Sequence, residues 1–314
     1  MNFQQLRSLR EAARRGFNLT EVARVLNTSQ PGVSRQIREL EDELGVDLFV
    51  RAGKRLTALT EMGELVLPTV ENMLRDADNL RRAGDEFSQQ LQGPLSIAAT
   101  HSQARYALPG AVRDFRVRFP GVRFNLHQGS PDQVADMLIT GEADVGIATE
   151  ALSEYGELVT LPCYRWTHSV IVPKGHPLQG SAPLTLDALA GYPIITYSPG
   201  YTGRLHIDDA FEKAGLAFDL IITAMDADVI KTYVELGLGV GIVASIAFDE
   251  ARDANLHAID AGHLFAVNLT KLAIRRGRFL RAYVYEFIET FAAPLDRAAV
   301  EAALATGPGV PAST

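Results

Sequence analysis

The sequence predicts an α/β protein with a small helical head, one long helix and a larger two-lobed domain. Three observations predict this fold class. The charge is uneven: residues 1–58 carry ten Lys and Arg against seven Asp and Glu, a net charge of +3, whereas the remaining residues carry 20 against 31, a net charge of −11. An apolar seam with a 3.5-residue period follows residue 60, and strands then alternate with helices. A chain of 314 residues has room for about two domains.

Two short helices are predicted at the start of the chain, over residues 3–15 and 19–26. In the first, apolar residues recur with the period of a helix that is buried along one side, at Phe3, Leu6, Leu9 and Ala13. The polar residues 27–29 then form a turn. We therefore expect a third helix directly after this turn.

The third predicted helix has one apolar face and one polar face. Thr28 or Ser29 can cap it, and Pro31 suits its first turn. The apolar face consists of Val33, Ile37, Leu40 and Leu44. The leading end and the opposite face carry Ser29, Gln30, Pro31, Ser34, Arg35 and Arg38. Because two short helices joined by a three-residue turn have the layout of a helix-turn-helix, we expect these six residues to contact DNA.

A basic hairpin is predicted after the third helix. Residues 46–51 and 56–59 have strand character and are joined by a turn. Arg51, Lys54 and Arg55 at the tip are placed to meet phosphates or a minor groove. A three-helix module with a solvated charged turn is the alternative. The hairpin and the local excess of positive charge favour a winged helix-turn-helix over the first 59 residues.

Residues 60–91 predict one long linker helix that is polar except for a narrow seam. The seam consists of Val66, Val70, Met73, Ala77, Leu80, Gly84, Phe87 and Leu91. So narrow a seam is typical of two paired helices, and we expect a homodimer formed with the same helix of a second chain. Packing of the seam on the core of its own chain is the alternative. Pro68 is expected to bend the helix near its start.

The remaining residues predict two α/β lobes with a cleft between them, an architecture like that of the periplasmic binding proteins. Strands and helices alternate over residues 95–148 and again over residues 169–244, and this order implies parallel strands with helices on the faces of the sheet. Ligands of open α/β sheets bind beyond the carboxyl ends of the strands. The predicted parts of this effector-binding domain, residues 92–314, are lobe I at about 92–163 and 268–304, lobe II at about 164–267, and a flexible tail at 305–314.

Polar side chains follow three of the predicted strands, where a ligand would bind. They are Thr100, Ser102, Gln103, Thr149, Tyr197 and Thr202. Hydroxyls and backbone N–H groups at helix amino ends can bind an anion without a fixed positive charge. Each threonine alone is better explained as an ordinary helix cap, and only the convergence of the three sets on one cleft would favour a ligand site. Tyr164 and Trp166, near the expected crossing between the lobes, fit either a ligand wall or the core.

Several other kinds of protein are excluded or disfavoured by the sequence. The single cysteine, Cys163, excludes an intrachain disulfide, and the seven histidines are too scattered for a metal site. The glycine-rich segment 237–241 follows a predicted helix rather than a strand, so it does not predict a dinucleotide site. No Gly-x-Ser-x-Gly elbow is present. We expect no enzyme, no metal and no cofactor, and we keep a solute-binding module without regulatory output as an alternative.

The start of the chain carries four arginines and no uninterrupted apolar block, which argues against a secretory signal. The longest uncharged apolar run, residues 236–248, is too short to cross a bilayer. We therefore expect a cytoplasmic protein with no membrane partner.

The motifs resemble those of a known family of regulators. Residues 28–41, with 44–45 and 48–51, resemble the signature of the LysR-type transcriptional regulators. Further blocks resemble the CysB-like branch, which controls cysteine biosynthesis and sulfur assimilation: residues 100–109, 127–131, 148–151, 161–164, 202–204, 226–233 and 237–241. These blocks cover nearly the whole chain.

This resemblance implies a homotetrameric regulator that binds promoter DNA and senses a small anionic effector, with RNA polymerase as a further possible partner. It assigns an anion or acetylated serine to the positions of Thr100, Ser102, Gln103, Thr149 and Thr202, with the aromatic residues Tyr164, Trp166 and Tyr197 nearby. Ser102 departs from the threonine common in the branch. A sister group controls the use of sulfonates and sulfate esters and responds to sulfate or adenosine phosphosulfate. Acetylserine, sulfate and adenosine phosphosulfate therefore all stay open as effectors.

Overall fold

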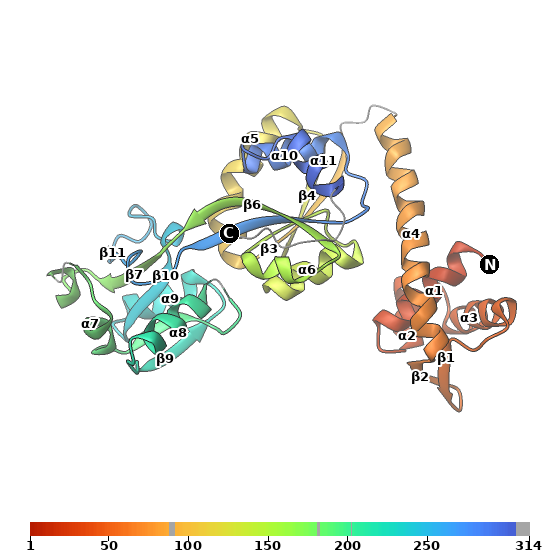
Figure 1. The fold of residues 1–314 in the computed structure, drawn as a ribbon, viewed down its shortest axis with the longest axis horizontal. Helices are drawn as coiled ribbons and strands as arrows, with labels where there is room; N and C mark the ends of the chain where they lie inside the picture. Colours follow the sequence, from red (N-terminus) through yellow and green to blue (C-terminus); the bar gives the residue numbers. More distant parts are fainter. Residues whose placement is uncertain (88–91, 181–182, 202, 306–314) are drawn as a thin grey trace. The chain divides into compact units, whose positions relative to one another are not determined.

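The structure, a computed structural model, describes residues 1–87, 92–180, 183–201 and 203–305. The chain divides into two compact units, Met1–Ser88 and Gln89–Thr314 (Figure 1). Three predicted features lie outside the described residues: Leu91 of the seam, Thr202, and all but the first residue of the expected tail. Within the described ranges, no helix is both long enough and apolar enough to cross a membrane.

The first unit begins with one helix, continues with a helix-turn-helix and a hairpin, and ends in a long helix (Figure 1). Its elements are α1 (Phe3–Arg14), α2 (Leu19–Val25), α3 (Gln30–Leu44), β1 (Phe49–Ala52), β2 (Arg55–Leu59) and α4 (Glu61–Phe87). The side chains of Asn2, Asn18 and Ser29 cap α1, α2 and α3 by accepting hydrogen bonds from N–H groups of each first turn. β1 pairs antiparallel with β2 and forms the wing.

Helices α1 to α3 enclose one apolar core. Val22, Val33 and Leu40 are fully buried in it, as the predicted apolar faces require. Leu44 was predicted to be buried, and this is wrong, because 41% of its surface is exposed. α3 ends at this residue, and Gly45 turns the chain away with a left-handed φ of 72°. Burial along α3 therefore stops one turn before the helix ends.

Helix α4 packs part of its predicted seam against the head of its own chain. Val70 of the seam is buried in the head core, and Val66 packs against it. The next buried residue is Leu74, whereas the predicted Met73 is 38% exposed. Leu80, also on the predicted seam, keeps 76% of its surface exposed. Pro68 lies inside the helix without ending it. The first part of the seam is thus used within the chain, whereas Leu80 stays exposed.

Lobe I of the second unit is a mixed sheet of strand order β4-β3-β5-β12-β6. Its elements are β3 (Gly93–Ala99), α5 (Leu108–Arg118), β4 (Val122–Gln128), α6 (Pro131–Thr140), β5 (Val145–Ala148), β6 (Leu158–Trp166), β12 (Asn268–Arg275), α10 (Ala282–Phe291) and α11 (Arg297–Ala305). β3 pairs in parallel with β4 and β5, and β12 runs antiparallel to β5 and β6. α5, α10 and α11 lie on one face of the sheet and α6 lies on the other (Figure 1).

Lobe II is a second mixed sheet, of strand order β11-β7-β10-β8-β9. Its elements are β7 (His168–Pro173), α7 (Leu186–Ala190), β8 (Ile194–Tyr197), α8 (Arg204–Lys213), β9 (Leu220–Ala224), α9 (Ala227–Glu235), β10 (Val240–Ala244), η4 (Ser245–Ala247) and β11 (Leu256–Asp260). β8 pairs in parallel with β9 and β10, as predicted. The prediction of parallel pairing is wrong for β7, which runs antiparallel to β10 and β11. β7 is entered from β6 of lobe I and lies between β11 and β10, on the other side of β10 from the parallel strands β8 and β9.

Two antiparallel strands, β6 and β12, carry the chain from lobe I to lobe II and back (Figure 1). Asn268 pairs with Trp166 at the end of this ladder that lies next to lobe II. In lobe I, the residues after β3 do not form one continuous α-helix, because Gln103–Ala107 forms a π-helical turn, η1, before α5 begins.

Candidate functional site

The predicted recognition residues lie along α3 and at its cap. Ser29 caps the helix, with its Oγ accepting a hydrogen bond from the N–H of Gly32 at 3.2 Å. Gln30, Arg35 and Arg38 are exposed. Pro31 is also exposed, and Ser34 is half-buried beside it. The Nε of Arg35 lies 2.7 Å from an oxygen of Glu39, its neighbour one turn along the helix, so this pair is local to α3. The helix therefore presents a polar and basic face to solvent.

The wing and the start of α3 line one hollow. Lys54 and Arg55 from the wing and Gln30 from α3 border a cavity of about 560 Å³ together with Asn18 and Thr20 at the start of α2. Two cations and several neutral donors around one concave surface suit a nucleic-acid backbone. Asn18 and Thr20 were not among the predicted DNA contacts, although the sequence shows that Asn18 can cap α2.

Arg51 differs from the other two basic residues of the wing. It pairs with Glu41 of α3, which is 5% exposed. The same carboxylate accepts hydrogen bonds from the N–H groups of Leu48 and Phe49 at 2.9 and 3.2 Å. A buried carboxylate requires such partners, because removal from water disfavours its charge. Arg51 and Glu41 thus hold the wing against α3.

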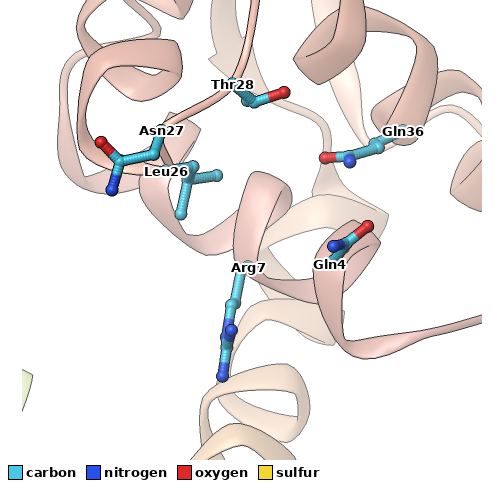
Figure 2. A pocket seen from close by; sticks show the side chains of 6 residues that line it. All are labelled: Gln4, Arg7, Leu26, Asn27, Thr28 and Gln36. Carbon is cyan, nitrogen blue, oxygen red and sulfur yellow. The ribbon is translucent and has the colours of Figure 1, made fainter.

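A second hollow of about 200 Å³ lies in the head, lined by Gln4, Arg7, Leu26, Asn27, Thr28 and Gln36 (Figure 2). Figure 2 shows the side chains of Thr28 and Gln36 extending toward the same space. The Oε1 of Gln36 accepts a hydrogen bond from the hydroxyl of Ser8 at 2.5 Å, which fixes this amide between α1 and α3. The hollow adds polar surface next to the cap of α3.

In the second unit, a hydrogen-bonded network joins the segment after β3 to both crossing strands. Gln103 donates from Nε2 to the hydroxyl oxygen of Thr270 at 3.1 Å and accepts a hydrogen bond from the hydroxyl of Tyr164. The Nε1 of Trp166 donates to the same Thr270 oxygen at 3.1 Å. Thr100, which precedes this segment, is 1% exposed. The structure therefore brings Gln103, Tyr164 and Trp166 together.

Tyr197 connects this region to lobe II. It lies at the end of β8 with no exposed surface, and its hydroxyl accepts a hydrogen bond from the N–H of Ala244 at 3.1 Å. Burial raises the pKa of Tyr197 to about 12, and hydrogen bonds to Ala244 and Ser102 act in the opposite direction. Because Ser102 belongs to lobe I, this contact shows that polar groups predicted from separate strands meet between the lobes.

Thr149 lies in a hollow of about 230 Å³ between the lobes. Tyr201, Gly203 and Arg204 border the same hollow from the segment that leads into α8. Arg204 is 7% exposed, donates from Nη1 to the carbonyl oxygen of Tyr197 at 2.6 Å and from Nε to Asp208 at 2.7 Å. The hollow therefore has a guanidinium at its border in addition to neutral donors.

Sequence reasoning missed two polar residues on β12. Thr270 has no exposed surface and receives the hydrogen bonds from Gln103 and Trp166. Asn268 is equally buried, and its Oδ1 has no hydrogen-bond partner within the part of the chain that the structure describes. Both residues lie on the same side of a largely apolar strand, an alternation that the sequence contains. In the same described part of the chain, no group of three or more His, Cys, Asp and Glu side chains could hold a metal ion.

Both units match known protein families. Residues 3–64 match the bacterial regulatory helix-turn-helix of the lysR family, and residues 88–295 match the LysR substrate binding domain. The chain belongs to the LysR family.

Individual LysR-family relatives are similar over nearly the whole length. The transcriptional regulator SsuR of Burkholderia cenocepacia is 58% identical over 96% of this chain and 97% of its own. CysB of the same organism is 54% identical over 97% of each chain. Among solved structures, the cofactor-binding domain of the Cbl regulator is 47% identical, with a TM-score of 0.66 over 68% of this chain and 94% of that one. A full-length OxyR of Pseudomonas aeruginosa is 22% identical, with a TM-score of 0.72 over 95% and 98% of the two chains, and shares the fold.

These similarities determine the class of protein. The LysR family consists of DNA-binding transcriptional regulators rather than enzymes. SsuR, CysB and Cbl are regulators of sulfur metabolism. The chain is accordingly a DNA-binding transcriptional regulator of this sulfur-assimilation branch.

Proposed function

We propose that this LysR-family regulator binds promoter DNA through α3 and the wing, and binds a small anionic sulfur-pathway effector between the two lobes. The candidate effectors are N-acetylserine, O-acetylserine, sulfate and adenosine phosphosulfate. The proposed response is a change in the relative placement of DNA-binding heads within an oligomer. The regulator would act in the cytoplasm, and its response would change the activity of RNA polymerase at the promoter.

The observation that carries the proposal is the convergence of the polar network on one cleft. Ser102 and Gln103 of lobe I meet Tyr197 of lobe II and Thr270 of the crossing strands. Buried polar groups are costly unless they are hydrogen-bonded, so a network of this kind in an α/β cleft supports a polar ligand. Hydroxyls, amides and the guanidinium of Arg204 can all donate to an oxyanion.

A thermal-shift screen of the candidate effectors tests the proposal. Effector bound to the folded state at about 100 times its Kd stabilises it by about 2.7 kcal/mol, so the correct compound should raise the Tm of the wild-type chain. Thr100→Val removes one buried hydroxyl and keeps the shape of the side chain. It should abolish most of the shift, and Thr223→Val, an exposed position on β9, should retain it. An unchanged shift in Thr100→Val would place the effector elsewhere.

The identity of the stabilising compound separates the two branches. A shift with acetylserine favours control of cysteine biosynthesis, and a shift with sulfate or adenosine phosphosulfate favours control of sulfonate and sulfate-ester use. A compound that binds but leaves promoter binding and transcription unchanged would not be the effector of this regulator.

The proposed oligomer is a homodimer through α4 that assembles into a homotetramer. Exposed apolar residues of α4 lie at Met62, Leu65, Met73 and Leu80, beside the face that packs on the head. In lobe II, exposed apolar residues occur in and just before α9, at Met225, Val229, Tyr233 and Leu236. Spacings of three and four residues place the second set on one side of the helix, which supports self-association.

A further inference from the structure

The segment that carries Gln103 has an unusual backbone. Gln103–Ala107 forms the π-helical turn η1, and the N–H of Leu108 bonds to the carbonyl oxygen of Gln103, five residues earlier. π-helical turns are rare, and they occur frequently at functional sites. A conformation of this kind persists where its surroundings hold it.

Side chains of η1 reach across to lobe II. Arg105 Nε donates to Asp228 Oδ2 at 2.9 Å, and the hydroxyl of Tyr106 donates to Asp228 Oδ1 at 2.6 Å. Asp228 lies in the first turn of α9. The ring of Tyr106 also packs against the apolar core cluster of lobe II that contains Ile171 and Val243. One carboxylate of lobe II therefore receives two hydrogen bonds from η1 of lobe I.

The other side of Asp228 is held by a buried lysine. Lys231, 8% exposed, places Nζ 3.0 Å from Asp228 Oδ1 and 3.1 Å from Asp253 Oδ1, and donates to the carbonyl oxygen of Ala247 at 2.9 Å. The same Nζ lies 5.3 Å from the centre of the Tyr106 ring. The buried Lys231 and Asp253 balance one another, and Arg105 and Asp228, whose side chains are 55% and 44% exposed, form the outer part of the cluster.

The electrostatics of Asp228 favour the charged form. Burial opposes its ionisation, but the hydrogen bonds from Tyr106 and Lys231 outweigh this effect and hold its pKa below the ordinary value. Asp228 therefore stays ionised at neutral pH. It keeps its contacts with Arg105 and Tyr106 of lobe I and with Lys231 of lobe II. Charge-assisted hydrogen bonds of this kind are stronger than neutral ones.

We infer that Asp228 is a positioning residue for the effector site: by binding Arg105 and Tyr106 it holds η1 as a π-helical turn and thereby keeps Gln103 directed at Thr270. This inference rests on the proposed function of the cleft. When the lobes separate, Arg105 and Tyr106 lose Asp228, and η1 can relax into an α-helical turn continuous with α5. A shift of one residue in register rotates a side chain by about 100° around the helix, which takes Gln103 away from Thr270.

Lobe closure and effector binding are then thermodynamically coupled. An effector bound by Gln103 favours the π-helical turn and the contacts to Asp228, and these contacts raise affinity for the effector by the same factor. The residues that couple the two processes touch lobe II and do not themselves need to touch the effector.

Hydrogen–deuterium exchange of the full-length chain without effector tests the backbone part of this inference. Tyr106→Phe removes only the hydroxyl that reaches Asp228. Tyr155→Phe is the matched control, because its hydroxyl donates to Asp132 at 2.9 Å within lobe I. We expect the amides of residues 103–108 to exchange about tenfold faster in Tyr106→Phe and at the wild-type rate in Tyr155→Phe. A purely structural loss of stability would instead raise exchange throughout lobe I.

Calorimetric titration with N-acetylserine, O-acetylserine, sulfate and adenosine phosphosulfate tests the coupling. Whichever compound binds the wild-type chain should bind Tyr106→Phe and Asp228→Asn about tenfold more weakly, and Tyr155→Phe equally well. Asp228 is not a positioning residue if two quantities stay at their wild-type values in both Tyr106→Phe and Asp228→Asn. These are the hydrogen–deuterium exchange rates of residues 103–108 and the affinity for the effector. If none of these compounds binds the wild-type chain, the proposed effectors are wrong, while the exchange experiment still decides whether Asp228 holds η1.

Discussion

At the scale of single residues, Gly203 shows how closely the segment before α8 approaches the crossing strands. Its φ of 69° lies in the left-handed region. A Cβ at this position would lie 2.3 Å from the Oδ1 of Asn268 and 2.9 Å from the Cε1 of His168. Glycine is therefore required here for two reasons, the backbone conformation and the space.

Gly203→Ala is expected to lower the free energy of unfolding by about 1–3 kcal/mol and to reduce effector affinity, because the loop must move off Asn268. Urea denaturation and calorimetry measure the two effects. Gly200→Ala is the control, since Gly200 has a φ of 80° but no atom within 4 Å of an added Cβ. Equal losses in the two variants would show that backbone strain alone matters and that the contact with Asn268 does not.

Cys163 is expected to be chemically inert in the folded protein. Burial raises the pKa of its thiol to about 12, so it stays protonated near pH 8, where an unfolded thiol is partly ionised. Alkylation by iodoacetamide near pH 8 should therefore be much slower in buffer than in concentrated urea. Because the folded pKa is raised, this residue stabilises the fold fully below about pH 8.5 and loses that contribution as the pH rises toward 12. Rapid alkylation of the folded chain would contradict the burial of this thiol.

At the scale of elements, α4 has two apolar surfaces that a single heptad seam does not distinguish. Val66, Val70 and Leu74 pack against the head, while Leu65 and Leu80 stay exposed. The helix also begins in close contact with the wing, where a Cβ on its residue 63 would lie 2.1 Å from the carbonyl oxygen of Leu48. The start of the helix is therefore part of the head, and the exposed surface is what a second chain can bind.

Leu80→Glu should break the contact between chains through α4 and so lower the mass of the oligomer, because it places a charge on the exposed apolar surface of α4. Light scattering coupled to gel filtration measures this change. Asn72→Glu adds the same charge at an exposed polar position of the helix and should leave the dimer intact. If Leu80→Glu keeps the mass of the wild-type oligomer, the chains do not associate through this surface of α4.

At the scale of the whole molecule, the charge is divided between a basic head and an acidic remainder. Lys54 and Arg55 of the wing border the hollow at the start of α3, whereas Arg51 is engaged by Glu41. A modest positive charge in one head implies weak binding by a single head, and an oligomer adds contacts by presenting several. The acidic remainder disfavours contact between the effector-binding domain and DNA.

Lys54→Ala should weaken promoter binding and reduce the slope of log K against log salt by about 1, because each phosphate contact releases counterions. Fluorescence anisotropy at several salt concentrations measures this slope. Lys213→Ala is the control. The Lys213 side chain is 80% exposed on α8, so this variant removes a positive charge of the same kind outside the head and should leave the slope unchanged. An unchanged slope in Lys54→Ala would mean that the wing does not contact phosphates.

The sequence alone was sufficient for the helices of the head, the wing, the two α/β lobes and the polar residues at the strand ends. Apolar periodicity and caps report local geometry, because each helix satisfies its hydrogen bonds within itself. The helix-turn-helix over α2 and α3 and the cap at Ser29 follow from such local patterns. The resemblance of the motifs then identified the family.

Only the tertiary structure decided how distant segments meet. The exposure of Leu44, the pairing of Arg51 with Glu41 and the π-helical turn at Gln103 each depend on partners far along the chain or on where the chain leaves the core. In the sequence, Thr270 is only a polar residue within an apolar strand. In the structure, β12 lies between β5 and β6, and Thr270 accepts a hydrogen bond from Gln103. The spacing of apolar residues predicts which face of a helix or strand is buried. Which polar groups lie opposite one another depends on the path of the whole chain.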